Sequence, residues 1–253
     1  MAERCVFITG GAGAIGLATA KVFAEAGWRV GIGDLAPALA AAPEGVEAFE
    51  HDVTEVAGWT DVLTRFCGAD GVLDVLVNNA GILRFGWFEE QSPTAHAAQV
   101  DVNVRGVVLG ASVALPFLRR AGTGCLVNVA SQASLQAAPR LATYSATKYA
   151  VRGLSEALAL EWERLGVRVA CLEPCLIDTP MLDSDDASGL SFRTAVTGAD
   201  VLTPDDVAQA MWTAVHGTDL HYPVGAAPTA LLETIRPQID RQRAQWRGRP
   251  ARS

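Results

Sequence analysis

The sequence predicts an α/β fold: a single doubly wound domain with a central parallel sheet of about seven strands and helices on both faces. Two observations predict it. Short apolar runs alternate with longer segments of helical periodicity along the chain, which is the pattern of βαβ units. The chain has 253 residues, is 50% hydrophobic, and shows no long linker or internal repeat. Residues 1–253 are therefore expected to form one domain.

The N-terminal elements follow from this alternation. The apolar run CVFITG at residues 5–10 predicts a strand, and a helical stretch covers residues 14–26. Gly27 is the expected end of that helix, because glycine readily adopts the backbone conformation that terminates helices. RVGIGD at 29–34 is a second strand, and VEAFEHD at 46–52 is a third with weaker alternation.

The middle of the chain continues the pattern. Residues 56–66 have helical periodicity, and VLDVLVNNAG at 72–81 predicts a buried strand that ends in turn residues. A long helical region covers about residues 93–120. GCLVNVAS at 124–131 predicts a fifth strand, which adds another crossover to the sheet.

The last elements complete the sheet. The mostly apolar stretch at 141–162 predicts a helix, and GVRVACLEP at 166–174 predicts a sixth strand. A helix over 206–216 and a short final strand over 220–225 follow. The alternation of strand and helix therefore persists to residue 225.

Two segments depart from the alternation. Residues 183–200 are polar and weakly periodic, so we expect a mobile substrate loop, with a disordered insert as the alternative. Residues 228–253 are expected to form a C-terminal helix and a basic tail, because Leu231, Ile235 and Ile239 recur every fourth residue. A solvated or subunit-contacting helix end is favoured over a nucleic-acid patch, since the rest of the chain is acidic.

Composition excludes several classes of function. The net charge of −8 argues against nucleic acid or an anionic membrane as a partner. No run of eighteen or more apolar residues occurs, so no membrane span is expected, and the N-terminus has no signal-peptide pattern. Five scattered cysteines without a CxxC pair favour reduced thiols in a cytoplasmic protein. The four histidines form no zinc motif, so no metal site is expected.

The turn after the first strand has the composition of a phosphate-binding loop. Residues 11–16 match GxGxxG between a strand and a helix, where glycines let backbone N–H groups approach a pyrophosphate. The second strand ends in Asp34, eighteen residues after Gly16. Its carboxylate can bind the ribose hydroxyls of NAD and would repel the 2′-phosphate of NADP, and no basic residue follows in 35–45. NAD is therefore favoured over NADP; the alternatives are a tight turn without ligand and an aspartate with only a turn role.

Tyr144 and Lys148 lie one turn apart on the helix predicted over 141–162, so their side chains share a face. Taken alone, the pair could be a surface tyrosine beside a surface lysine. Transfer of a hydride to or from an alcohol carbon needs a group that moves the hydroxyl proton, and a phenol can do this when its pKa of about 10 is lowered. Lys148, together with the positive nicotinamide ring, is expected to lower it.

Taken together, these features resemble the short-chain dehydrogenase/reductase family, in its short single-domain branch. The family's TGxxxGxG turn corresponds to residues 9–16, with Ala14 where glycine is usual, and its NNAG corresponds to residues 78–81. Its PGxxxTxM resembles residues 174–181, with Cys175 in place of the usual glycine. The resemblance implies a Rossmann-type domain that binds NAD. The cofactor residues that it implies are Thr9, Gly10, Gly13, Ala14, Ile15, Gly16, Asp34, Leu35, Asp52, Val53, Asn79, Ala80, Gly81, Tyr144, Lys148, Pro174, Ile177 and Thr179.

The same resemblance implies the catalytic residues. Tyr144 would transfer the proton, and Ser131, thirteen residues before it, would hold the substrate oxygen. Lys148 would also bind the nicotinamide ribose, and Asn103 would help to hold a relay water. Members of the family often assemble through this helix, so a homodimer or homotetramer is expected.

Sequence reasoning says least about the substrate, a small-molecule secondary alcohol or ketone. The expected substrate residues are Leu83, Phe85, Ser134, Leu141 and Leu182. Most are apolar, which favours a hydrophobic substrate, up to the size of a steroid; the alternative is that they are simply core. Two other functions stay open at this point: a non-catalytic NAD-sensing regulator of the same fold, and a sugar-nucleotide epimerase, although the latter usually has a separate substrate domain.

Overall fold

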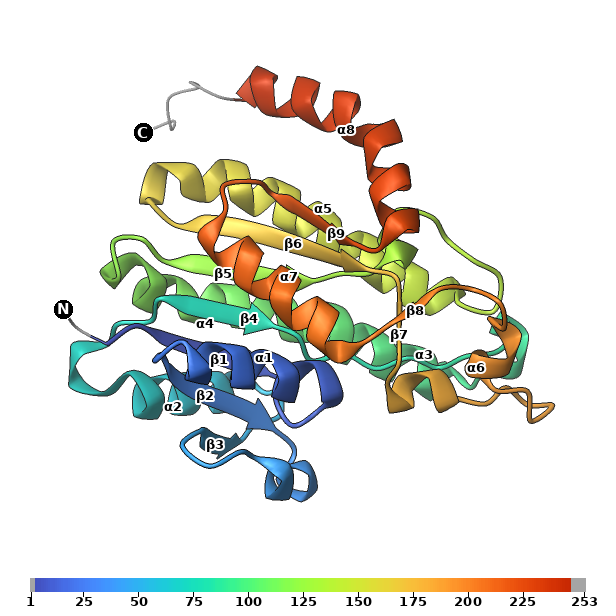
Figure 1. The fold of residues 1–253 in the computed structure, drawn as a ribbon, viewed down its shortest axis with the longest axis horizontal. Helices are drawn as coiled ribbons and strands as arrows, with labels where there is room; N and C mark the ends of the chain where they lie inside the picture. Colours follow the sequence, from blue (N-terminus) through green and yellow to red (C-terminus); the bar gives the residue numbers. More distant parts are fainter. Residues whose placement is uncertain (1–2, 247–253) are drawn as a thin grey trace.

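The computed structural model describes residues 3–246, whose strands form one seven-stranded sheet and a two-stranded ribbon. The order in the large sheet is β3-β2-β1-β4-β5-β6-β9, and every neighbouring pair is parallel (Figure 1). The seven-stranded parallel sheet with surrounding helices is therefore confirmed. Its strands are β1 Cys5–Thr9, β2 Arg29–Asp34, β3 Glu47–Glu50, β4 Val75–Asn78, β5 Cys125–Val129, β6 Arg168–Pro174 and β9 His221–Val224.

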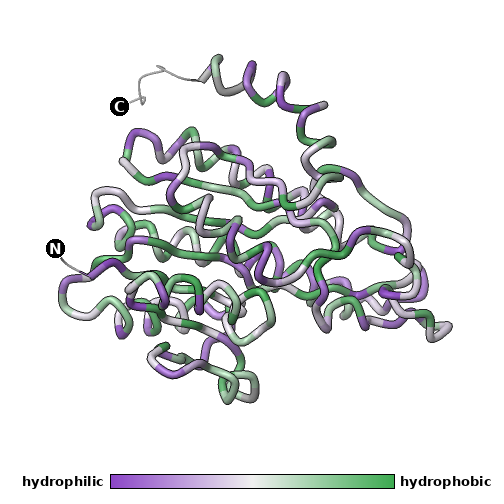
Figure 2. Tube along the Cα trace, in the orientation of Figure 1, coloured by the Kyte–Doolittle hydropathy of each residue, from purple (hydrophilic) through white to green (hydrophobic). Residues whose placement is uncertain are grey.

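Helices cover both faces of the sheet. In Figure 1, α1 and α7 lie in front of the strands, and α2, α4 and α5 lie behind them. Their bounds are α1 Ala14–Glu25, α2 Val56–Cys67, α3 Pro93–Val100, α4 Gly106–Arg120, α5 Ala142–Trp162, α7 Pro204–His216 and α8 Ala226–Trp246. Because both faces are covered, the strands are hydrophobic along most of their length, as Figure 2 shows.

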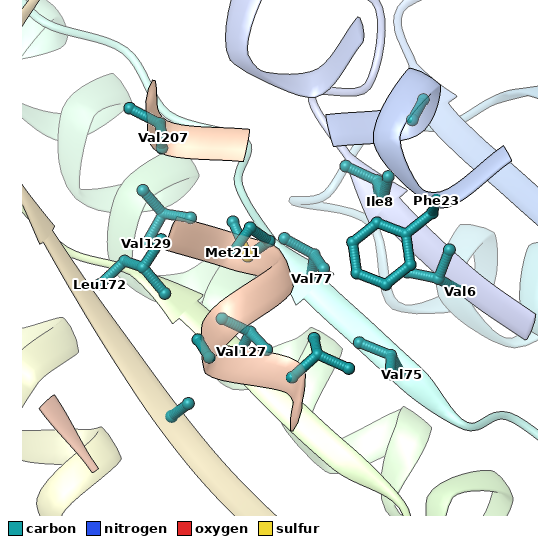
Figure 3. Packing of buried hydrophobic residues seen from close by; sticks show 14 of the residues in the cluster. Val6, Ile8, Phe23, Val75, Val77, Val127, Val129, Leu172, Val207 and Met211 are labelled. Carbon is teal, nitrogen blue, oxygen red and sulfur yellow. The ribbon is translucent and has the colours of Figure 1, made fainter. Parts of the chain in front are cut away.

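The core consists of two layers, one on each face of the sheet. Phe23 of α1 and Met211 of α7 pack on valines and isoleucines of the strands in the first layer (Figure 3). Trp59 and Phe66 of α2 and Leu118 of α4 fill the second. All five of these side chains are fully buried. The two layers hold the strand ends rigidly, which fixes the loops that follow them.

Some predicted boundaries were too wide. The strand predicted over 46–52 ends at Glu50, because the Asp52 carboxylate accepts hydrogen bonds from the backbone N–H and hydroxyl of Thr54 and forms a turn. The ribbon of β7 Leu176–Ile177 and β8 Val201–Leu202 was not predicted. Its two strands lie on either side of the segment 183–200 in the sequence, so the two ends of that segment are close together in space.

The helix predicted over 93–120 is continuous but not uniform. A π-helical turn, Asp101–Arg105, separates α3 from α4 and contains Asn103. By length and composition Pro93–Arg120 could cross a membrane, although it contains no uninterrupted run of eighteen apolar residues. In the structure Ala111, Ala114 and Leu118 of this helix face the sheet instead.

Residues 183–200 have more structure than a loop. The segment contains an isolated bridge between Asp185 and Ser191 and a short helix, α6 Phe192–Ala195. Phe192 is buried against Phe85, with ring centroids 5.1 Å apart. The alternative of a disordered insert is therefore wrong, because an aromatic anchor fixes the segment.

The C-terminal helix is present as α8, which begins directly after β9. In the described part of α8, Pro228, Leu232 and Ile239 are buried, and Leu231 and Ile235 are partly buried. Of the predicted stripe of Leu231, Ile235 and Ile239, Ile239 is therefore buried and the other two are partly exposed. Of the basic tail, residues 247–253 lie outside the described part of the chain.

Candidate active site

A cavity of about 1020 Å³ opens at the carboxyl ends of the strands. It lies where the strand order reverses between β1 and β4, which is the place where open α/β sheets bind ligands. The glycine turn and Asp34 line one end of the cavity, and Tyr144 and Lys148 line the other. The volume is large enough for a dinucleotide and part of a substrate together.

The glycine turn leaves the start of α1 free to receive an anion. Gly10 has a φ of +60°, and a Cβ there would lie 2.8 Å from the Cα of Ala80, so only glycine fits. No side chain caps the first turn of α1, whose N-cap is Gly13, and that turn has no acidic residue. Gly10, Gly13, Ala14 and other turn residues line the cavity. Uncapped amides and the helix dipole therefore fit a diphosphate.

Asp34 is held in place at the end of β2. Its carboxylate accepts hydrogen bonds from the backbone N–H of Ala12 (3.0 Å) and of Leu35 (2.8 Å). The free lone pairs of both oxygens can still accept hydrogen bonds from ribose hydroxyls. Leu35, which is exposed, lines the same end of the cavity.

The remaining cofactor residues predicted from the sequence fall into two groups. Ile15, Asp52, Val53, Asn79, Ala80, Gly81, Pro174, Ile177 and Thr179 line the cavity. Thr9 and Gly16 do not, and they support the turn from behind. The Thr9 hydroxyl accepts the backbone N–H groups of Asn79 and Ala80 (3.1 Å each), and the Asn79 amide donates to the carbonyls of Thr9 and Gly10 (3.0 Å each).

Helix α5 brings Tyr144 and Lys148 to the other end of the cavity. Both side chains are at most 9% exposed, so the surface-pair alternative is wrong. The Lys148 ammonium lies 5.6 Å from the centre of the Tyr144 ring and donates to the Val129 carbonyl at 2.9 Å. Ser131, which follows β5, hydrogen-bonds to Tyr144. The three side chains therefore meet around one point of the cavity wall.

Burial dominates the protonation of this group. It raises the pKa of the Tyr144 phenol, against which the hydrogen bond from Ser131 acts only partly. It lowers the pKa of Lys148 to about 8. The expectation that Lys148 and the positive nicotinamide ring together lower the phenol's pKa stays a prediction. A protein that buries both groups holds the phenol in its neutral, proton-donating form.

Asn103 is fully buried in the π-helical turn and does not line the cavity. Its side-chain amide accepts the Ile82 N–H and donates to the Ile82 carbonyl, both at 2.8 Å, and donates to the Thr147 hydroxyl at 3.1 Å. It therefore connects the segment after β4 to α5. The water-holding role of Asn103 stays a prediction.

The predicted substrate residues are only partly brought together. Leu83, Leu141 and Leu182 line the cavity beside Tyr144. Phe85 lies behind them, stacked on Phe192, and does not line the cavity. Ser134 is fully buried and does not line it either, because its hydroxyl donates to the Ser131 carbonyl at 2.6 Å.

Sequence reasoning missed several lining residues. Leu176 belongs to the wall near Tyr144, and His51 and Gly33 belong to the adenosine end. Phe192 and Val196 also line that wall; they lie in the segment 183–200 that was predicted to reach the substrate, but they were not named individually. Phe192 stands in a polar segment without periodicity, so only its isolation as a large apolar residue could have indicated it. Cys175, where the family has glycine, also lines the cavity with its thiol beside Gly225.

Three metal-ligand donors converge away from the cavity, which the sequence did not indicate. Cys171, Glu173 and His221 are buried, and one donor atom of each lies within 4.8 Å of the others. They come from β6 and β9, which are neighbours only in the sheet. His221 Nδ1 and Glu173 Oε1 are 2.6 Å apart, shorter than the roughly 3.4 Å between two ligands of one tetrahedral zinc ion. The arrangement is that of a hydrogen-bonded pair.

Comparison with known proteins places this site in a family. A family model described as short chain dehydrogenase matches residues 4–188. A 2,5-dichloro-2,5-cyclohexadiene-1,4-diol dehydrogenase from Sphingobium indicum is 38% identical over 192 residues, covering 72% of this chain and 76% of that protein. A 3-alpha-(or 20-beta)-hydroxysteroid dehydrogenase from Mycobacterium tuberculosis is 36% identical over 185 residues, covering 71% of each chain.

A solved structure of a short-chain dehydrogenase/reductase is similar to this chain over almost its full length. A short chain dehydrogenase/reductase from Burkholderia phymatum, in complex with NAD, is similar with a TM-score of 0.81 at 26% identity, covering 99% of this chain and 98% of that chain. The chain therefore belongs to the short-chain dehydrogenase/reductase family and is an NAD(P)-dependent oxidoreductase that acts on CH–OH groups.

Proposed function

We propose that this protein is a cytoplasmic NAD-dependent dehydrogenase that interconverts a hydrophobic secondary alcohol and its ketone. One observation carries the proposal: a single cavity joins a diphosphate cradle and Asp34 to the buried Tyr144–Lys148 pair. The five cysteines are free thiols, as expected of that compartment.

The residues of the chain have separate tasks in this reaction. When bound, the nicotinamide accepts a hydride from the alcohol carbon or returns one to the ketone. As the phenolate, Tyr144 would take the alcohol proton during oxidation, and as the neutral phenol it would give that proton to the ketone oxygen during reduction. Ser131 donates to the substrate oxygen and holds it beside the phenol. Lys148 lies close enough to bind ribose hydroxyls and keeps positive charge near Tyr144.

Asp34 supports NAD as the cofactor. Its carboxylate is oriented by two backbone N–H groups and lines the cavity with Leu35, an uncharged neighbour. A 2′-phosphate at this position would face a fixed negative charge with no arginine or lysine among the lining residues at that end.

The wall around Tyr144 supports a hydrophobic substrate. Leu83, Leu141, Leu182 and Phe192 surround the phenol, and Arg140 is held away by an ion pair with Asp186 at 3.2 Å. The relatives named for a cyclic diol and for steroids point in the same direction. A cyclic alcohol, as bulky as a steroid, is the substrate class that we propose.

The test measures reduction of NAD with a panel of cyclic, steroid and acyclic secondary alcohols, and the reverse reaction with the matching ketones. We expect turnover that is highest with bulky hydrophobic cyclic substrates. Turnover only with charged substrates would contradict the proposed substrate class. Binding of NADH without turnover of any substrate would support a non-catalytic NAD-sensing regulator instead, a function to which the named relatives give no support.

A further inference from the structure

A chain of polar contacts runs behind the catalytic residues, outside the cavity. It begins at the short turn Gln132–Ser134, which directly follows Ser131. The Ser134 N–H and hydroxyl both bond to the Ser131 carbonyl, at 2.9 and 2.6 Å. The position of Ser131 is therefore fixed by this turn and by whatever holds the turn.

Arg152 of α5 holds that turn from the outside. Its Nη1 donates to the Ser134 carbonyl at 2.7 Å, and its Nε donates to Glu156 Oε1, one helical turn further, at 2.9 Å. The side chains of Arg152 and Glu156 are 18% and 22% exposed, so this ion pair is partly shielded from water. A guanidinium makes both contacts with donors whose positions are fixed by its planar geometry, whereas the three donors of an ammonium share one atom.

Glu156 lies next to the last strand of the sheet. Its Oε1 is 3.6 Å from Nε2 of His221 in β9, beyond hydrogen-bond distance, and the other nitrogen of that ring is bonded to the fully buried Glu173. The hydrogen-bonded chain therefore runs from the Ser131 turn through Arg152 to Glu156.

We propose that Arg152 is a positioning residue for the reaction, which sets the Ser131 turn through the Ser134 carbonyl and is itself held by its ion pair with Glu156. The proposal rests on the proposed function, because it assigns Arg152 a role in placing Ser131. Arg152 touches neither the cavity nor Tyr144's hydroxyl, so its effect is on geometry and not on proton transfer itself.

Arg152→Met is the first test, because methionine keeps an unbranched stem and removes both donors. We expect kcat to fall by roughly tenfold to a hundredfold, the effect of a misplaced reacting group, while NADH binding stays unchanged. Arg152→Lys should recover only part of the loss. Arg65→Met is the matched control, since Arg65 forms the same type of helical pair with Asp61 on α2, away from the site. An unchanged kcat in Arg152→Met would overturn the proposal, as would a loss in the Arg65→Met control of the same size.

A second measurement does not depend on turnover. Amide hydrogen exchange in peptides covering 131–136 should be faster in Arg152→Met than in the parent, while exchange in α2 and in the strands stays the same. Once a substrate is known, kinetics give a further test. In the double variant with Ser134→Ala, the loss in log kcat should be smaller than the sum of the losses in the two single variants, since both changes loosen one turn. If the peptides covering 131–136 exchange at the parental rate in Arg152→Met, the positioning role is refuted, even if no substrate has been found. Faster exchange in an enzyme without alcohol turnover would instead refute only the proposed function.

Discussion

At the scale of single residues, burial has opposite effects on the two members of the Tyr144–Lys148 pair. It raises the phenol's pKa and lowers the ammonium's, so burial disfavours the charged form of both groups. A sequence shows the spacing of the two residues but not how deeply their side chains are buried from solvent. The spacing was therefore sufficient to place the two side chains on one face of α5 and insufficient to predict their protonation.

Removal of the phenol hydroxyl tests the catalytic role directly. Tyr144→Phe keeps the ring in its buried place, so folding and NADH binding should be retained, while turnover should fall by about two to four powers of ten. Tyr222→Phe is the control, because that hydroxyl only accepts the Asp219 N–H beside β9. Steady-state kinetics with one alcohol and both variants decide the matter. Parental rates in Tyr144→Phe would remove Tyr144 from the mechanism.

The buried Lys148 ammonium should lower the stability of the folded protein, by an amount that depends on pH. Its pKa of about 8 in the folded protein lies below the 10.5 of an unperturbed lysine. Below pH 8, burial of the protonated Lys148 therefore lowers the free energy of unfolding by its full amount. This loss of stability disappears as the pH rises towards 10.5, because the lysine then becomes neutral in the unfolded chain as well. Lys148→Met should accordingly melt at a higher temperature than the parent at pH 7, with a smaller gain at pH 10. Lys21→Met, at an exposed lysine, should show neither effect. A Lys148→Met variant less stable at pH 7 would contradict this.

Asp34 should determine the choice between the two nicotinamide cofactors. In the parent, kcat/KM with NAD should exceed that with NADP at least tenfold, since the carboxylate favours ribose hydroxyls and repels a phosphate. Asp34→Ala removes both effects and should narrow the ratio. Asp61→Ala, on the exposed face of α2, should leave it unchanged. Equal efficiencies in the parent, measured with one substrate at one ionic strength, would show that Asp34 has no such role.

At the scale of elements, strands and helices were predictable where burial is periodic. Both faces of β4 and β5 are covered, so their sequences are continuous apolar runs that stand out. The π-helical turn at Asn103 and the ribbon of β7 and β8 were not predictable, because they depend on partners distant in sequence. Ser134 illustrates the same limit: it was predicted to contact the substrate, but its hydroxyl bonds the backbone carbonyl of Ser131 instead.

The short helix α6 should contribute to substrate binding alone. Phe192 lines the substrate end of the cavity and stacks on Phe85, far from the glycine turn. Phe192→Ala should raise KM for a bulky hydrophobic alcohol by about tenfold, because it removes an aromatic contact, and should leave the Kd of NADH unchanged. Phe88→Ala, at an exposed phenylalanine, is the control. A loss of NADH affinity in Phe192→Ala would place α6 at the cofactor instead.

At the scale of the whole molecule, the outer faces of the layer that contains α4 and α5 remain apolar. Val108 and Tyr149 are more than 40% exposed, and a Cβ at Gly153 would meet nothing within 4 Å. Small and apolar side chains on neighbouring helices allow close helix–helix packing between subunits. We therefore expect sedimentation at micromolar concentration to show a dimer or tetramer. Val108→Glu should shift it towards monomer, whereas Val56→Glu, at an even more exposed valine on α2, should not. A parent protein that sediments as a monomer would mean that these faces stay in contact with water.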